Sequence, residues 1–89
     1  MIFTYLLKSG VDGSYYTGIA ENTDNRLSQH NAGKVKSTSS KKPWKLVYKK
    51  EHINYEEARK HEKWLKKKNH QYKDKLAGSE NLPAWAAGL

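Results

Sequence analysis

The side chains with the most chemical information lie on a predicted helix in the C-terminal half of the chain. Four residues share one face of this helix because they follow i, i+3, i+4, i+7 spacing: Ala58, His61, Glu62 and Leu65. Ala58 and Leu65 should face inward, which draws Glu62 toward the core or a cleft. A carboxylate in such a place needs a cation, a set of hydrogen bonds or a bound metal. On this pattern alone, a solvated ion pair with Lys66 at i, i+4 is the simpler interpretation.

Arg26 and His30 are a second pair with chemical potential. They are four residues apart on another predicted helix, so they are stacked on one face. The planar guanidinium of Arg26 can clamp a phosphate, and His30 can donate to phosphate or move a proton near neutral pH. Taken alone, both residues are more simply interpreted as ordinary polar positions.

Two tyrosines on the first two predicted strands complete the set. Asp12-Gly13 is a turn signal between these strands. If the hairpin pairs around this turn, Tyr5 and Tyr16 approach each other on neighbouring strands. Core packing is the ordinary role of a strand tyrosine.

The elements that must position these residues follow from hydrophobic periodicity. It predicts strands over residues 2–8, 14–19 and 44–50. A first helix is expected from a cap in residues 22–24 to about residue 31, with Gly33 as its stop, and a second over about residues 55–68, with Asn54 as its cap. The order β-β-α-β-α predicts an α+β fold with a small, mostly antiparallel three-stranded sheet flanked by helices. We expect residues 1–75 to form one domain and residues 76–89 to form a tail of undetermined structure.

More detailed expectations concern the strands and the basic segment. The first strand has apolar residues on both faces and should therefore be central. On the third strand, Trp44, Leu46 and Tyr48 should share one side. The polar, lysine-rich residues 34–42 predict a mobile surface loop.

Charge and composition limit the classes of partner. Residues 34–75 carry 15 basic and five acidic residues, a net charge of +10 within a chain of net charge +8. Such a stripe attracts polyanions, although charge alone does not separate nucleic acid from a membrane surface or an acidic protein. The absence of cysteine excludes disulfides, zinc–thiolate sites and cysteine nucleophiles. The short apolar run at the N-terminus predicts neither a signal peptide nor a membrane span, and we expect a cytoplasmic location.

Together, these residues resemble the motif set of the GIY-YIG nuclease superfamily. Phe3-Thr4-Tyr5 and Tyr16-Thr17-Gly18 correspond to the two half-motifs, with ten residues between the tyrosines, and Arg26, His30 and Glu62 match the family's polar positions. The similarity covers about residues 2–72. It is closest to short stand-alone bacterial members related to the N-terminal nuclease domain of the excision-repair incision subunit.

The chain departs from the family pattern at a few motif positions. Phe3-Thr4 replaces Gly-Ile, Thr17 replaces isoleucine, and Ala20 stands where threonine or serine is common. The tyrosine of the first half-motif and the glycine of the second remain in place, so we expect the fold to tolerate these changes.

The resemblance implies a metal-dependent endonuclease that hydrolyses phosphodiester bonds of nucleic acid, with DNA favoured over RNA as the substrate. It implies weak sequence specificity or a preference for structured nucleic acid. It also implies that Glu62 holds one Mg²⁺ or Mn²⁺, that Arg26 clamps the phosphate, and that Tyr16 hydrogen-bonds the phosphate or positions the attacking water. Tyr5 resembles the family's general base, with His30 as its helper or as the base itself. Eight lysines are expected to form two walls of a phosphate-binding channel: Lys34, Lys36, Lys41, Lys42 and Lys45 on one side, and Lys63, Lys66 and Lys67 on the other.

Two alternatives remain open at this stage. A catalytically inactive nucleic-acid-binding module would keep salt-dependent binding without divalent-dependent cleavage. An adaptor would use the lysine-rich surface to dock on an acidic protein. Retention of all five polar positions favours the nuclease, because binding alone does not require them. A protein partner for targeting is compatible with a domain of this size, and the sequence does not determine the oligomeric state.

Overall fold

The computed structural model describes the backbone of residues 1–81 and the side chains of residues 1–78, so part of the expected tail lies outside the described residues. The elements are β1 (Ile2–Ser9), β2 (Tyr15–Ala20), α1 (Thr23–Asn31), the 3₁₀ helix η1 (Lys36–Lys41), β3 (Trp44–His52), α2 (Tyr55–Lys66) and α3 (His70–Asn81). The α+β class and the predicted order are confirmed, with α3 added after α2. None of the helices in this part of the chain is long and apolar enough to cross a bilayer.

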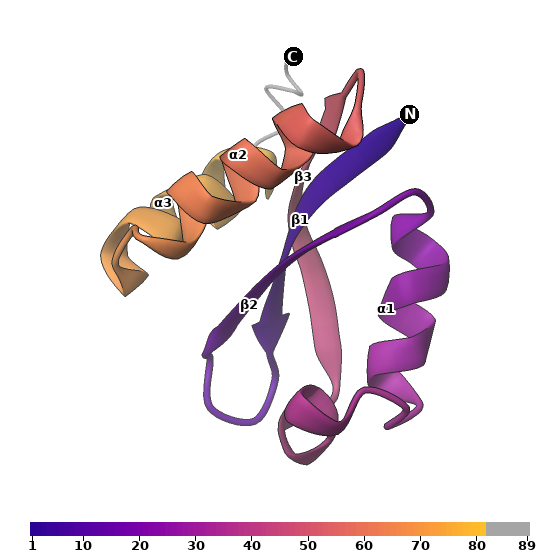
Figure 1. The fold of residues 1–89 in the computed structure, drawn as a ribbon. Helices are drawn as coiled ribbons and strands as arrows, with labels where there is room; N and C mark the ends of the chain where they lie inside the picture. The colour runs from indigo at the N-terminus through magenta and orange to yellow at the C-terminus, as the bar shows by residue number, and fades with distance from the viewer. Residues whose placement is uncertain (82–89) are drawn as a thin grey trace.

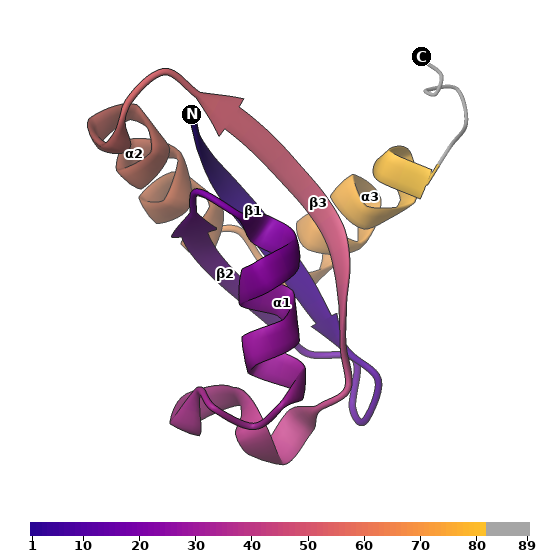
Figure 2. The ribbon, with the colours of Figure 1, turned by 90° about the vertical axis from the view of Figure 1, so that its right-hand side faces the viewer.

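The three strands form one antiparallel sheet in the order β2-β1-β3, which confirms that β1 is central. Helix α1 covers one face of the sheet, and α2 and α3 cover the other (Figures 1 and 2). The sheet therefore separates two packing layers, and β2 forms an edge strand at which both layers can be reached.

Alternation along β1 supplies both layers of the core. Leu6 packs with Leu65 of α2 and Ala77 of α3 on one face. On the other face, Tyr5 and Leu7 form a cluster that contacts α1. A strand that buries both faces is stable only in the middle of the sheet, which is why β1 takes that place.

The prediction for the faces of β3 is wrong at Tyr48. Leu6 pairs with Tyr48 while Leu7 pairs with Leu46, so Val47 is an extra residue opposite the step between them. This bulge shifts the alternation, and Tyr48 packs with the Leu6 cluster instead of sharing a side with Leu46.

The expected surface loop at residues 34–42 is also wrong, since the chain forms η1 there. The side chain of Thr38, in the middle of η1, is fully buried, and its hydroxyl donates to the Val35 carbonyl at 3.2 Å. Its own carbonyl accepts from the Trp44 indole N–H at 2.9 Å. Short polar side chains satisfy the tight backbone of η1, a local pairing that composition alone does not reveal.

Helix ends follow the predicted caps. Asn22 and Asn54 accept hydrogen bonds from the backbone N–H three residues on, each at 2.9 Å. Gly33, just after α1, has a φ of 77°, the conformation expected of a glycine stop. Asn69 caps α3 in the same way through the N–H of Tyr72, and this signal would have located the helix that sequence periodicity missed.

Candidate active site

The backbone of Tyr5 is in β1, the central strand, and its ring lies over β2, the neighbouring edge strand. Its Cα partner on β2 is Gly18. A Cβ added to Gly18 would lie 2.6 Å from the Tyr5 hydroxyl oxygen and 2.7 Å from its ring carbon Cζ. Only a residue without a side chain leaves room for this ring, so Gly18 determines where the Tyr5 hydroxyl lies.

His30 of α1 joins this hydroxyl to η1. Its Nε2 is 3.2 Å from the Tyr5 hydroxyl, and its Nδ1 is 2.8 Å from Oγ1 of Thr38. Since the Thr38 hydroxyl donates its one proton to Val35, it accepts from Nδ1–H. This assignment leaves Nε2 as the acceptor for the Tyr5 O–H.

Burial sets the protonation states of both groups. His30 is fully buried, and desolvation, helped by the charge of Arg26, lowers its pKa. Burial raises the pKa of Tyr5, and this effect outweighs an opposing hydrogen bond from Arg26. At neutral pH the pair therefore consists of a neutral phenol and a neutral imidazole.

Tyr16 and Arg26 lie beside this pair. The Tyr16 ring is centred 4.9 Å from the His30 ring and 6.4 Å from the Tyr5 ring, and Tyr16 is half-buried. Arg26 is half-buried one helical turn before His30, and its Nη1 donates to Gln29 at 2.7 Å. Because Arg26 and His30 share one face of α1, as predicted, the guanidinium of Arg26 lies beside the Tyr5 phenol.

Glu62 approaches from the other layer of the fold. Helix α2 packs on the sheet through fully buried Ala58 and Leu65, and the Thr4 hydroxyl donates to the Ala58 carbonyl at 2.9 Å. The Glu62 side chain is only 16% exposed, and its charge contributes to raising the pKa of Tyr5. Glu62 also pairs with Lys66 at 3.3 Å, so the expected ion pair is present, but Glu62 is largely covered instead of solvated.

The donor set at Glu62 fits one type of metal. Among residues 1–78, no three His, Asp or Glu side chains gather in a way that could hold a metal ion. A single partly buried carboxylate is a hard oxygen donor, and it suits Mg²⁺ or Mn²⁺, which keep several waters and take other oxygens from phosphate.

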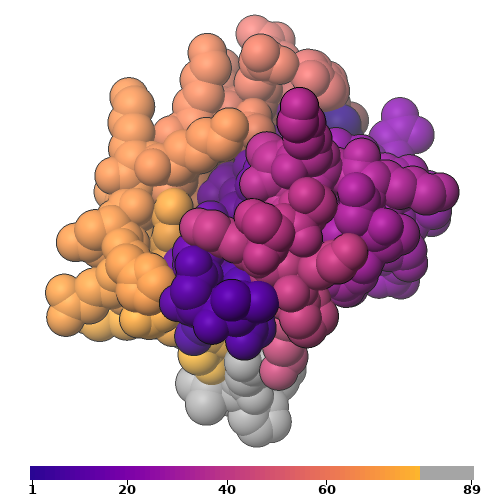
Figure 3. Space-filling model, turned by 90° about the horizontal axis from the view of Figure 1, so that it is seen from below, coloured from indigo at the N-terminus to yellow at the C-terminus, as the bar shows by residue number. Residues whose placement is uncertain are grey.

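The eight predicted channel lysines are all exposed. Seen from below, atoms of β2 are recessed between the orange α2–α3 layer and the magenta segment that contains η1 (Figure 3). Two of these lysines already have carboxylate partners, since Lys41 lies 3.4 Å from Asp12 and Lys66 pairs with Glu62. Lys45 lies on β3, at the other edge of the sheet from β2, whereas the other lysines of the two expected groups lie on or beside η1 and α2.

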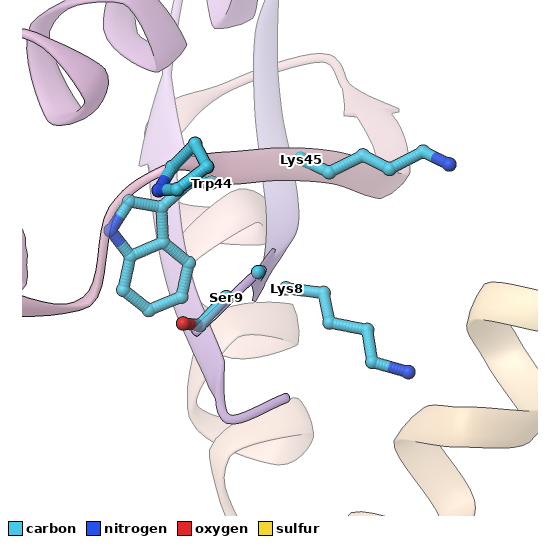
Figure 4. Close-up of a pocket in the computed structure, with 6 residues that line it drawn as sticks. Lys8, Ser9, Trp44 and Lys45 are labelled. Atoms are coloured by element: carbon cyan, nitrogen blue, oxygen red, sulfur yellow. The ribbon is translucent and has the colours of Figure 1, made fainter. Parts of the chain in front are cut away.

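Lys8 is a cation near this region that the sequence did not single out. It is the Cα partner of Lys45, and both line a pocket of about 260 Å³ with Ser9, Gly10 and Trp44. Both ammonium groups extend in the same direction, while the Trp44 indole turns away from them (Figure 4). The ion pair from Lys8 to Asp74 is long, at 3.9 Å. Lys8 pairs with Lys45 only through the register of β1 and β3, which the sequence does not reveal.

Comparison with known proteins identifies the class. Residues 1–75 match the family described as the GIY-YIG catalytic domain. The chain belongs to this family, whose members are nucleases that generally use divalent metals.

Its relatives are short stand-alone proteins of the UPF0213 group. A UPF0213 protein of Staphylococcus epidermidis is 39% identical over 75 residues, which cover 83% of this chain and 90% of the relative. One of Streptococcus sanguinis is 40% identical over 72 residues, covering 80% and 82%. The solution NMR structure of a UPF0213 protein from Bacillus halodurans has a TM-score of 0.57 at 32% identity, and the match covers 93% of this chain and 89% of that one.

Proposed function

We propose that this protein is a metal-dependent endonuclease that hydrolyses phosphodiester bonds in nucleic acid, with DNA as the first substrate to test. The observation that carries the proposal is the Tyr5 hydroxyl, which is bonded to His30 and lies within electrostatic reach of both Arg26 and Glu62. Packing does not require that a guanidinium and a carboxylate from opposite layers of the fold both influence the pKa of one phenol. They are the groups that phosphodiester hydrolysis uses.

In this proposal, a proton relay runs from Tyr5 to His30. The attacking water forms the new oxygen–phosphorus bond and gives its proton to the Tyr5 oxygen, while Tyr5 passes its own proton to Nε2 of His30. The leaving oxygen departs with the electron pair of the broken phosphorus–oxygen bond. Because burial raises the pKa of Tyr5, a free phenolate is a poor candidate for the base, and His30 supplies the proton acceptor instead.

Other groups hold the phosphate and its charge. Arg26 clamps the scissile phosphate through its planar donors, and Tyr16 orients the phosphate or the water. Glu62 would hold the divalent metal, which supplies charge stabilisation for the phosphoryl group and the leaving oxygen when bound. Thr38 keeps His30 in the tautomer that can accept a proton.

The substrate is recognised mainly through its backbone. Exposed lysines on and beside η1 and α2 would contact phosphates, and such contacts position a strand without reading its bases. Weak sequence specificity, with selection by nucleic-acid structure, follows from this type of contact.

An inactive nucleic-acid-binding module is the second candidate. The observation in its favour is the ion pair between Glu62 and Lys66, which gives the carboxylate a partner without a metal. Cleavage separates the two candidates, because both would bind nucleic acid in a salt-dependent manner.

The decisive experiment incubates supercoiled plasmid and Mn²⁺ with the wild type, with Glu62→Ala and with the control Glu57→Ala. Glu57 is an exposed glutamate of the same helix, paired with Lys60 at 3.7 Å. We expect Glu62→Ala to lower the cleavage rate by about 100-fold or more and Glu57→Ala to retain it. Equal cutting by the wild type and Glu62→Ala would refute the role of Glu62.

A further inference from the structure

Helices α2 and α3 carry an aromatic cluster that the proposed catalytic site does not use. Trp64 stacks on His61 with ring centroids 5.2 Å apart and meets Tyr72 of α3 edge-on at 5.7 Å. The Lys68 ammonium lies 4.8 Å from the centre of the Trp64 ring and 5.4 Å from that of Tyr72. We call Trp64, Tyr72 and Lys68 the aromatic platform.

Packing of α2 does not explain Trp64. The helix meets the sheet through Ala58 and Leu65, both fully buried, whereas Trp64 is 41% exposed. Although His61 and Tyr72 cover part of the ring, a tryptophan that is 41% exposed outside the buried face of α2 offers a flat aromatic surface to a partner.

The charges around Trp64 indicate the partner. Lys60 lies one helical turn before Trp64, and Lys68 follows the end of α2 with its ammonium over the ring. Lys63 on α2 and Lys67 at its C-cap are exposed. The acidic groups of this stretch already have lysine partners, since Glu57 pairs with Lys60 and Glu62 with Lys66. Lysines that alternate with an exposed aromatic ring fit a chain of phosphates with bases between them. Insertion into a membrane would require several neighbouring apolar side chains, whereas the aromatic neighbours of Trp64 are His61 and Tyr72 and exposed lysines surround them.

We propose that Trp64 stacks on an unpaired base of single-stranded nucleic acid, with Lys60 and Lys68 against the flanking phosphates. The inference rests on the proposed function for the class of ligand. Lys68 leaves the ring when the base arrives, because an exposed cation–π contact is weaker than stacking between a base and an aromatic ring.

The aromatic platform would give a nucleic-acid strand that is bound at the catalytic site a second contact with the protein. Trp64 is two residues after Glu62, so the two side chains leave α2 about 200° apart. A strand bound at Glu62 therefore crosses the outer surface of α2, past Lys63 and Lys67, before it reaches Trp64. The substrate this arrangement favours carries an unpaired segment next to the cut.

The test measures binding without metal, at physiological salt, in a Glu62→Gln background. The two probes are a short oligothymidylate and an oligomer of the same length with abasic sugars. Trp64→Ala should weaken binding of the oligothymidylate by about tenfold and leave the abasic oligomer within about twofold. Trp64→Phe, which keeps a ring, should restore most of the loss. Tyr55→Ala is the matched control, since Tyr55 is also an exposed aromatic residue of α2, 53% exposed.

Several outcomes would overturn the proposal. These are an unchanged affinity in Trp64→Ala, an equal loss on both probes, an equal loss in Tyr55→Ala, or tighter binding of the wild type to phosphatidylserine vesicles than to oligothymidylate. Plasmid cleavage by the wild type is measured separately. If Trp64→Ala weakens binding of oligothymidylate alone but the wild type does not cleave plasmid, the platform is supported and the proposed nuclease activity is refuted. If the wild type cleaves plasmid but Trp64→Ala binds oligothymidylate normally, the nuclease activity is supported and the platform is refuted.

Discussion

The Tyr5 hydroxyl and Nε2 of His30 lie 3.2 Å apart, which joins the central strand of the sheet to α1. The imidazole is held from its other nitrogen by Thr38, so the proton of the phenol has one defined acceptor. The contact exists only because Gly18 leaves the space over β2 open for the Tyr5 ring.

Gly18→Ala should therefore damage both the fold and the site. The new methyl group would lie 2.6 Å from the Tyr5 hydroxyl, closer than real contacts allow, and 3.2 Å from Cε2 of Tyr16, which is tighter than most real contacts. We expect a loss of about 1–3 kcal/mol in the free energy of unfolding, measured by urea titration, and a marked fall in cleavage rate.

The control for this change is Gly78→Ala. Gly78 lies in α3, and a methyl group added there would have no neighbouring atom within 4 Å. Alanine should therefore raise the free energy of unfolding by up to about 1 kcal/mol. If Gly18→Ala were as stable as the wild type, the Tyr5 ring would not lie over Gly18.

Arg26→Ala tests both the phosphate clamp and the effect of the Arg26 charge on the pKa of His30. The cleavage rate should fall by about 100-fold, because the charge developing on the phosphate loses its planar donor. The pKa of His30 should rise, since the charge of Arg26 helps to lower it, and an NMR titration of the imidazole would detect this. Arg59→Ala, at the exposed arginine bonded to Tyr55, should change neither quantity. Intact turnover in Arg26→Ala would rule out the clamp.

His30 should make stability depend on pH. Its pKa in the folded protein is below its unfolded value of about 6.5, so the unfolded chain binds the proton first as the pH falls. The free energy of unfolding should therefore be constant above this value and decrease as the pH drops from there toward the lower folded pKa. Thermal denaturation between about pH 7.5 and pH 5 would measure the effect.

Comparison of two histidine variants isolates the contribution of His30. The pKa of His61 is also lowered, chiefly by burial, so its contribution has the same sign. His30→Gln and His61→Gln should each remove part of the slope. A slope that survives unchanged in His30→Gln would show that this imidazole is not held neutral in the folded protein.

Lys63 of α2 and Lys67 at its C-cap should contribute to the salt dependence of nucleic-acid binding. Replacing Lys63 and Lys67 together by alanine should reduce the slope of log affinity against log salt concentration by about two. Lys49→Ala is the control, because Lys49 lies on β3 at the other edge of the sheet, with its ammonium 5.1 Å from the centre of the Phe3 ring. Equal slopes in the wild type and the double variant would remove these lysines from the nucleic-acid interface.

Much of the local structure is readable from the sequence. Apolar residues on both faces of residues 2–8 predicted the central strand, and Asn54 predicted the start of α2. Such features depend on neighbours within a few residues, where side-chain spacing and capping directly determine the backbone conformation.

Pairings between distant residues required the tertiary structure. The bulge at Val47 moved Tyr48 to the other face, since register depends on the partner strand as well as on alternation. Likewise, composition indicated a loop where Thr38 turns inward to reach His30.

The sequence by itself determined which side chains are available for chemistry and on which elements they lie, because residue type and periodicity are local properties. Only the tertiary structure decided that His30 and Arg26 of α1 lie beside the Tyr5 hydroxyl, and that the charge of Glu62 on α2, in the other layer, contributes to the raised pKa of Tyr5. That convergence depends on how two helices pack against the same strands, and no spacing along the chain encodes the distance between them.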